Sequence, residues 1–252
     1  MKRSAKVLLL RGMNVLYKYI GDHNPSEVLK NLKRFVEDGT ISASDPRGFN
    51  DPSEFKINFS FKGSPSQIEQ YFKEINAIPD MYEEWMESHR IVCNEMAVET
   101  RDLCLKQFGV VCLTPFEKNG LMWSHYSVSH KGFCIGFDDE FAETIDDFHL
   151  FSDVKYVSHV PEYNVLNDMS ELIDILFFSK HESWGYEKEK RIITKSSGVK
   201  KFDKSFIKEI ILGHNVSQDV ESYAKTLIGS HINIFKMRTP EDSYSLQKEP
   251  LL

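Results

Sequence analysis

Two glutamates and an arginine stand at alternate positions in one segment, as Glu187, Glu189 and Arg191. The run Ile192-Ile193-Thr194 that follows favours an extended conformation, in which alternate side chains share one face. Two carboxylates beside an arginine can set one another's charge state and accept hydrogen bonds from a polyhydroxyl ligand. The alternative is a solvated strand edge, whose ion pairs would contribute little to stability. Both interpretations place these residues on a strand that begins near residue 186.

Aromatic and histidine side chains gather in a second segment, which contains Trp123, His125, Tyr126 and His130. Such a group can stack a planar ring and form hydrogen bonds to phosphate or ribose. In the alternative interpretation, Trp123 and Tyr126 belong to the hydrophobic core and His125 has a structural role. His125 and His130 are five positions apart, which suits neither two ligands on one helix face nor two on one strand face. We therefore expect no metal site in this segment.

The loop 49–54 is a third unusual segment, because it is rich in carboxylate and amide groups. Asn50 and Asp51 are typical of a turn, in which their side chains bond to the local backbone. Asp51 and Glu54 could also combine with Glu187 in a metal-dependent hydrolase, although the spacing of these carboxylates specifies no metal.

Short strands and helices must position these segments. Asn24 as N-cap and Pro25 at the first helical position indicate a helix that ends at Gly39. A mainly helical insertion at 65–108 separates two β-rich parts, and the polar tail at 240–252 is expected to be loose. The fold class is therefore α+β, with small mixed or antiparallel sheets in a single domain over 1–252. We expect strands at 16–20, 40–44, 110–113, 133–137, 154–157, 186–194, 207–212 and 232–235, and further helices at 164–181 and 217–228.

The composition of the 252 residues, 41% hydrophobic and 27% charged, is typical of a globular protein and excludes a collagen-like repeat. Lys and Arg total 31 and Asp and Glu total 38, so the net charge is −7. This charge argues against general binding to duplex nucleic acid, which depends on many cationic contacts to phosphate. The apolar residues 7–10 are interrupted by Arg11, and no run approaches the ~20 apolar residues of a membrane span. We therefore expect a cytoplasmic protein whose four cysteines, which form no C-x-x-C pair, are reduced.

Four ordered motifs resemble those of a bacterial family classified only as a domain of unknown function, DUF2971. Ser53 departs from the family pattern, which usually has an aromatic residue before the glutamate, and this weakens any role for the apolar side of that loop. Members of the family resemble accessory or defence proteins, so a role in bacterial defence or as a toxin is implied. The motifs are LYKY at 16–19, FNDP-x-E at 49–54, W-x-HY-x-x-x-H-x-G at 123–132 and W-x-YE-x-E-x-R at 184–191.

A weaker resemblance bears on activity. The order of a tyrosine-bearing strand, a helix, a serine-bearing strand and a Glu-x-Glu pair is similar to that of ADP-ribosyltransferases, which bind NAD in a split β-sandwich. The resemblance implies that Glu189 stabilises the oxocarbenium-like ribose formed when the nicotinamide bond breaks. Glu187 would orient the acceptor, and Tyr19 would stack on nicotinamide as part of the catalytic group. The expected NAD-binding residues are Tyr17, Ser42, Ser44, Asn50, Asp51, Trp123, His125, Tyr126, His130 and Arg191.

Two alternatives to the transferase remain open from the sequence. The same residues could form a non-catalytic module that binds a nucleotide or a partner protein, with Glu187, Glu189 and Arg191 as structural ion pairs. The second alternative is the metal-dependent hydrolysis of a nucleic acid. The expected partners are accordingly NAD or another nucleotide, together with an acceptor macromolecule in the case of a transferase.

Overall fold

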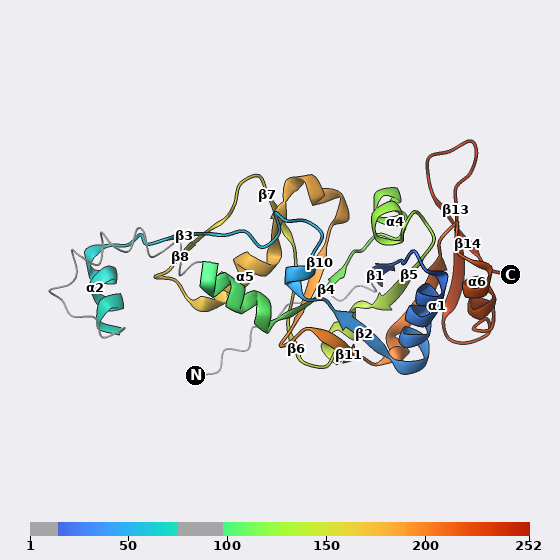
Figure 1. Cartoon of the computed structure of the whole chain (residues 1–252), viewed down its shortest axis with the longest axis horizontal. Helices are drawn as coiled ribbons and strands as arrows, with labels where there is room; N and C mark the ends of the chain where they lie inside the picture. Colours follow the sequence, from blue (N-terminus) through green and yellow to red (C-terminus); the bar gives the residue numbers. More distant parts are fainter. Residues whose placement is uncertain (1–14, 75–97) are drawn as a thin grey trace. The chain divides into compact units, whose positions relative to one another are not determined.

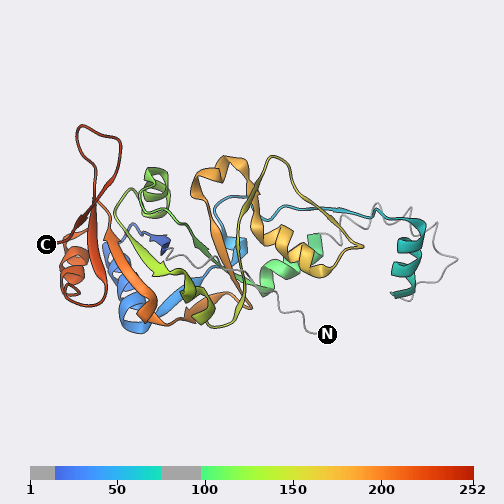
Figure 2. The ribbon, with the colours of Figure 1, turned by 180° about the vertical axis from the view of Figure 1, so that it is seen from behind.

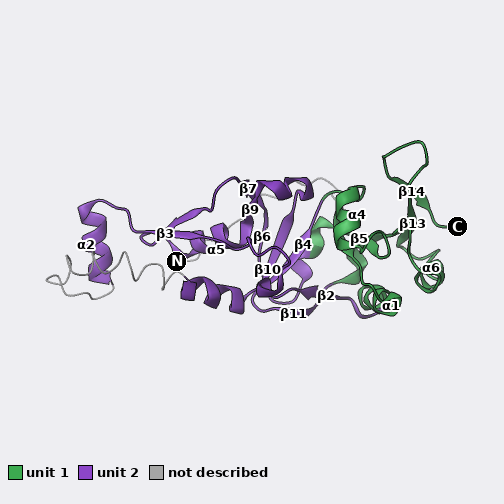
Figure 3. Cartoon of the chain, turned by 45° about the horizontal axis from the view of Figure 1, so that its top comes forward, with its two compact units in different colours: residues 1–36, 115–141, 203–252 green, residues 37–114, 142–202 purple. Residues whose placement is uncertain are grey.

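The computed structural model describes residues 15–74 and 98–252, and it divides the chain into two compact units (Figure 3). Unit 1 contains residues 1–36, 115–141 and 203–252, and unit 2 contains residues 37–114 and 142–202. The chain thus passes from one unit to the other several times. The α+β fold class predicted from the sequence is confirmed, with several small sheets and short helices. The single domain and the transferase-like sandwich stay predictions.

Unit 1 is built on a five-stranded sheet (Figure 1). Neighbouring strands are antiparallel except for β12 and β13, which are parallel. The strand order is β1 (Val15–Ile20), β5 (Phe133–Asp138), β12 (Ile207–Leu212), β13 (Asn233–Arg238) and β14 (Gln247–Pro250). Helices α1 (Pro25–Lys33) and α6 (Gln218–Lys225) lie side by side in both ribbon views (Figure 1, Figure 2). A third helix of unit 1, α4, spans Gly120–Tyr126.

Helix α1 begins as the sequence predicts, because the side chain of Asn24 accepts a hydrogen bond from the backbone N–H of Ser26. The helix continues as a π-helical turn over Arg34–Asp38 and stops at Gly39, which has φ of 63°. Phe35 in this last turn packs against Phe133 and Phe137 of β5, with ring centroids 6.2 and 6.1 Å apart. The helix is thereby anchored to the core of unit 1.

Unit 2 contains a three-stranded sheet and three two-stranded pairs. The central strand β10 (Lys190–Thr194) pairs antiparallel with β4 (Gly109–Leu113) and β6 (Phe148–Asp153). The antiparallel pair is β2 (Thr40–Ala43) with β11 (Gly198–Lys201); the parallel pairs are β3 (Asn58–Ser60) with β8 (Glu162–Asn164), and β7 (Lys155–Val157) with β9 (Ser179–His181).

The core of unit 2 joins β4 and β10 to helix α5 (Met169–Phe178). Val110, Ile193 and Phe177 are fully buried there, and the rings of Phe55 and Phe108 pack on Phe177 at 5.7 and 5.5 Å. Because β10 is central in its sheet and packs on this cluster, residues that lie next to it are removed from water. The unit also contains α2 (Pro65–Glu74), helical residues 98–107 and the short 3-10 turns η2 (Pro46–Gly48) and η5 (Glu182–Glu187).

Three sequence predictions about these elements need correction. The strand predicted over 186–194 begins only at Lys190, because residues 182–187 form the 3-10 turn η5 and Lys188 has a left-handed backbone, with φ of 45°. The tail predicted to be loose contains β14, whose residues pair with β13. The helix predicted over 164–181 is shorter, because Asp168 caps α5 and β9 follows it.

The predicted helical insertion at 65–108 is helical at both described ends, and its centre, residues 75–97, lies outside the described residues. The same holds for the apolar stretch at 7–10. Within 15–74 and 98–252, none of the helices combines the length and the apolar character that crossing a bilayer requires.

Candidate functional site

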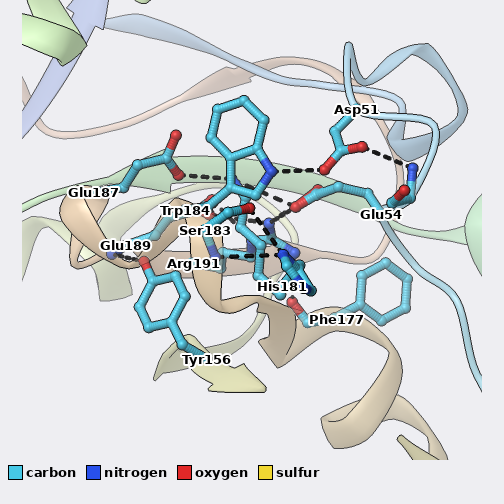
Figure 4. A network of polar contacts seen from close by, with 12 residues as sticks. Asp51, Glu54, Tyr156, Phe177, His181, Ser183, Trp184, Glu187, Glu189 and Arg191 are labelled. Carbon is cyan, nitrogen blue, oxygen red and sulfur yellow. Dashed lines mark hydrogen bonds and ion pairs between the residues drawn. The ribbon is translucent and has the colours of Figure 1, made fainter. Parts of the chain in front are cut away.

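Five charged side chains meet in the interior of unit 2 (Figure 4). The side chains are between 0% and 7% exposed, although charged groups are rarely buried unless they are paired. We call this group the charge network. Its members are Glu54, Lys180, Glu187, Glu189 and Arg191.

Arg191 links two of the carboxylates. Its Nε donates to Oε1 of Glu189 at 2.8 Å, and its Nη2 donates to Oε1 of Glu54 at 2.7 Å. The remaining terminal nitrogen, Nη1, donates to the backbone carbonyl of Phe177 at 2.8 Å. A planar guanidinium suits this arrangement, because its N–H groups point in fixed directions in one plane. The carboxylates hold the pKa of Arg191 far above its usual value although burial alone would lower it.

Lys180 links all three carboxylates. Its ammonium donates to Glu187 at 2.6 Å and to Glu189 at 3.1 Å, and Oε1 of Glu54 lies 3.5 Å away. Burial alone would lower the pKa of Lys180, but the three carboxylates outweigh burial and raise it. For Glu189, burial favours the neutral acid, yet Arg191 and Lys180 together lower its pKa to about 2. The network therefore keeps these charges at neutral pH.

The backbone around η5 and β10 brings the carboxylates together. His181 caps η5, since its Nδ1 accepts from the backbone N–H of Ser183 at 3.3 Å. The left-handed Lys188 then turns the chain into β10. On either side of this turn, Thr114 donates from Oγ1 to the carbonyl of Glu187 at 2.6 Å, and the N–H of Glu189 donates to Oη of Tyr156 at 2.8 Å. Glu187 and Glu189 thus face the same lysine from a turn and from the start of a strand.

A cavity of about 370 Å³ lies beside the charge network in unit 2. Lys180 belongs to both, because its ammonium is bonded to the network and the residue lines the cavity. Trp184 and Asp51 also line the cavity, and Nε1 of Trp184 donates to Oδ2 of Asp51 at 2.7 Å (Figure 4). The remaining lining residues are Ser53, Phe55, Lys56, Val157, Ser158, His159, Val160, Pro161, Ser179, His181 and Ser183.

The site residues predicted from the sequence that belong to unit 2 are only partly brought together. Glu187, Glu189 and Arg191 meet in the network, as alternation along a strand predicted, although the turn at Lys188 and not a continuous strand achieves this. Asp51 lies in the cavity wall. The residues predicted for ribose or turn contacts, Ser42, Ser44 and Asn50, are exposed and do not line the cavity.

The other predicted residues belong to unit 1. Tyr19 is buried, and its hydroxyl donates to the carbonyl of Phe116 at 2.9 Å. Trp123 is completely buried, and the ring of His130 stacks on it at 5.6 Å. Trp123 and Tyr19 make an edge contact at 5.1 Å, and the burial of Trp123 agrees with the core interpretation of the segment. Tyr17 is buried beside Glu209, Tyr126 is half-buried and His125 is exposed on α4. A single NAD site that uses residues of both units stays a prediction.

Sequence reasoning missed two residues that connect the network to the cavity, Lys180 and Trp184. Trp184 is part of the W-x-YE-x-E-x-R motif, which could have indicated it. Lys180 has a weaker signal, because it follows the apolar run that ends α5 at Phe178, where a lysine is unexpected in a core. In the described residues, 15–74 and 98–252, no group of three or more His, Cys, Asp and Glu side chains is arranged to hold a metal ion.

Residues 122–192 match the model of a family described as "Protein of unknown function (DUF2971)". The family resemblance indicated by the sequence motifs is confirmed over this span, which includes the aromatic segment and the W-x-YE-x-E-x-R motif. The matched span contains four of the five network residues, and Glu54 lies before it. No curated protein and no solved structure matches the chain.

Proposed function

We propose that unit 2 is a binding module for a nucleotide, with the cavity beside the charge network as its site. The observation that supports this function is the position of Lys180, which lines the cavity while buried carboxylates fix its charge and its place. Lys180 is thus a fixed part of the cavity wall, whereas Lys56, which is exposed and lines the same cavity, has the ammonium group that a ligand can reach. The cavity of about 370 Å³ falls within the range of small-molecule sites.

The chemistry of the cavity wall fits a sugar phosphate. Lys56 offers an ammonium group for phosphate oxygens, and serine hydroxyls can donate to or accept from ribose hydroxyls. Two histidines, His159 and His181, add further ring nitrogens. NAD is the first ligand to test, because the resemblance to ADP-ribosyltransferases implies it.

Binding is better supported than NAD turnover. A transferase needs the carboxylate of Glu189 beside the ribose, whereas here its Oε1 accepts from Arg191 at 2.8 Å and its Oε2 accepts from Lys180 at 3.1 Å. Neither Glu187 nor Glu189 lines the cavity. Glu189 would have to exchange one of these bonds for a ribose hydroxyl before it could act, so the geometry favours a non-catalytic nucleotide module over the transferase.

Titration calorimetry with NAD and AMP on the full chain tests the binding function. Lys56 is exposed and lines the cavity, so Lys56→Met should fold normally and weaken binding several-fold. The matched control is Lys62→Met, which removes an exposed lysine that pairs with Glu162 and does not line the cavity; its affinity should equal that of the wild type. The proposal is overturned if neither nucleotide binds saturably, or if both variants bind like the wild type.

The same samples decide between binding and turnover. Labelled NAD is incubated with the protein, with and without a cell extract, and free nicotinamide and labelled macromolecules are measured. The proposed module leaves NAD intact. Nicotinamide release that disappears in Glu189→Gln would instead support the transferase and its assignment of Glu189.

A further inference from the structure

Trp184 is the largest aromatic side chain on the cavity wall, and two contacts fix its ring. Its Nε1 donates to Asp51 at 2.7 Å, and the ammonium of Lys180 lies over the indole, 4.8 Å from the ring centroid. The hydrogen bond sets the direction of the ring edge, and the cation holds the ring against the charge network. The indole of Trp184 is thus held in a fixed orientation in the cavity wall.

Asp51 is itself held in place from behind. Its Oδ1 accepts from the backbone N–H of Ser53 at 2.8 Å, which leaves Oδ2 for Trp184. The carbonyl of Asp51 accepts from the N–H of Glu54 at 3.1 Å, and the carboxylate of Glu54 bonds to Arg191. One short turn therefore ties the orientation of the indole to the buried network.

The geometry points to Trp184 as the surface on which the heteroaromatic base of the nucleotide stacks, and to Asp51 as the positioning residue that orients it. This inference rests on the proposed nucleotide-binding function and adds the base to it. Stacking suits any base, because every base has a π-face. The role of Asp51 is that of a hydrogen-bond acceptor, in which both of its carboxylate oxygens are used.

The first part of the test compares AMP with ribose 5-phosphate, which lacks the base. Titration calorimetry on the full chain should show that AMP binds more tightly. Trp184→Ala should weaken AMP about tenfold, equivalent to about 1.4 kcal/mol, and leave ribose 5-phosphate unchanged. Trp184→Phe keeps a ring without the N–H donor and should lose less affinity than Trp184→Ala.

The second part separates the positioning role from a merely structural one. Asp51→Ala should weaken AMP and change the near-ultraviolet circular dichroism of the indole, with Trp184→Phe identifying the signal of that residue. Asp51→Asn keeps one oxygen acceptor for the two N–H groups of Ser53 and Trp184, so it should recover only part of the affinity and of the spectrum. The affinity for ribose 5-phosphate should not change in Asp51→Ala, whereas a merely structural role would lower it. The matched control, Asp168→Ala, removes an aspartate that also accepts from a backbone N–H two residues ahead, at 2.7 Å, but does not line the cavity; it should bind AMP like the wild type.

The outcomes distinguish this inference from the function on which it rests. If AMP and ribose 5-phosphate bind with equal affinity, or if Trp184→Ala binds AMP like the wild type, base stacking is wrong and the phosphate-binding cavity stands. If Asp51→Ala binds AMP like the wild type, or weakens ribose 5-phosphate as much as AMP, the positioning role is wrong. If neither probe binds the wild type, both the proposed function and the stacking inference are overturned.

Discussion

In unit 1 the buried carboxylate of Glu209 accepts a hydrogen bond from the hydroxyl of Tyr17, at 2.8 Å, and its two oxygens accept from the ammonium of Lys248, at 2.9 and 3.1 Å. In unit 2, by contrast, three carboxylates share two cations. Gly136 leaves space for Tyr17 and Glu209 in unit 1. It pairs with both residues in the sheet, and a Cβ on it would come within 2.9 Å of the tyrosine ring. In unit 1 a neutral hydroxyl thus donates to the buried carboxylate beside one cation, whereas in unit 2 the buried carboxylates are bonded to two cations.

The difference concerns how strongly each group depends on its neighbours. If Tyr17 loses its hydroxyl, Glu209 still has the ammonium of Lys248, which is partly exposed to water. If the network in unit 2 loses one cation, the three buried carboxylates share the single cation that remains, and the cost of their desolvation is no longer fully offset. Substitutions in the two clusters should therefore differ in size, in charge dependence and in pH dependence.

The largest effect is expected for Arg191→Met, which keeps much of the side-chain volume and removes the charge. Glu54 and Glu189 would then remain buried with only Lys180 as a cation. Removing one partner of a buried ion pair typically costs about 3–5 kcal/mol of unfolding free energy. Urea unfolding followed by circular dichroism measures the loss, and hydrogen exchange should locate it in unit 2. As a control, Arg47→Met removes an exposed arginine that pairs with Asp45 and should change the unfolding free energy little. Equal losses of unfolding free energy in Arg191→Met and Arg47→Met would show that the buried network does not depend on its cation.

The next effect is a dependence on acid pH. The pKa of Glu189 is about 2 in the folded chain against an ordinary value of 4.5, so the unfolded state takes up the proton first as pH falls. The resulting stabilisation, about 3 kcal/mol for such a shift, is complete above pH 4.5 and is lost as pH falls toward 2. Glu189→Gln should therefore show a flatter decline in unfolding free energy over this range. Glu27→Gln, which alters an exposed pair with Lys30, should keep the wild-type slope. An unchanged slope in Glu189→Gln would refute the lowered pKa of Glu189.

The smallest effect is expected in unit 1 for Tyr17→Phe. Burial, and to a smaller extent Glu209, raises the pKa of Tyr17, so its phenol stays protonated. The substitution therefore removes one neutral hydrogen-bond donor to the carboxylate of Glu209. We expect a loss of roughly 1–2 kcal/mol in unfolding free energy. The control is Tyr244→Phe at a fully exposed position, which should be neutral. A loss as large as that of Arg191→Met would show that the hydroxyl is as indispensable as the buried cation.

Local signals in the sequence predicted several elements well. The N-cap Asn24, the first-turn Pro25 and the stop at Gly39 define α1 and its final turn, because capping depends on neighbouring residues only. The predicted strand 207–212 coincides with β12, which is apolar and central in its sheet. These predictions succeeded where the chemistry of a few adjacent residues decides the structure.

The candidate site was predicted less completely, for a physical reason. The alternation of Glu187, Glu189 and Arg191 correctly indicated that these side chains meet, but the sequence did not reveal that Lys188 is left-handed or that Lys180 lies among the carboxylates. The partners of a buried charge come from distant segments, and a single sequence holds no record of such contacts. The bond between Glu54 and Arg191 joins residues far apart in the chain and is of this kind.

The repeated passage of the chain between the units has a consequence for protein synthesis. All residues of unit 2 have been made once residue 202 is added, whereas β12, β13 and β14 of unit 1 are still to come. Until then β5 has only β1 as a partner, and the edge that β12 will occupy is open. An unpaired edge of an apolar strand invites pairing with other chains. The nascent protein is therefore most exposed to misassembly between the completion of β5 at residue 138 and the completion of β12 at residue 212.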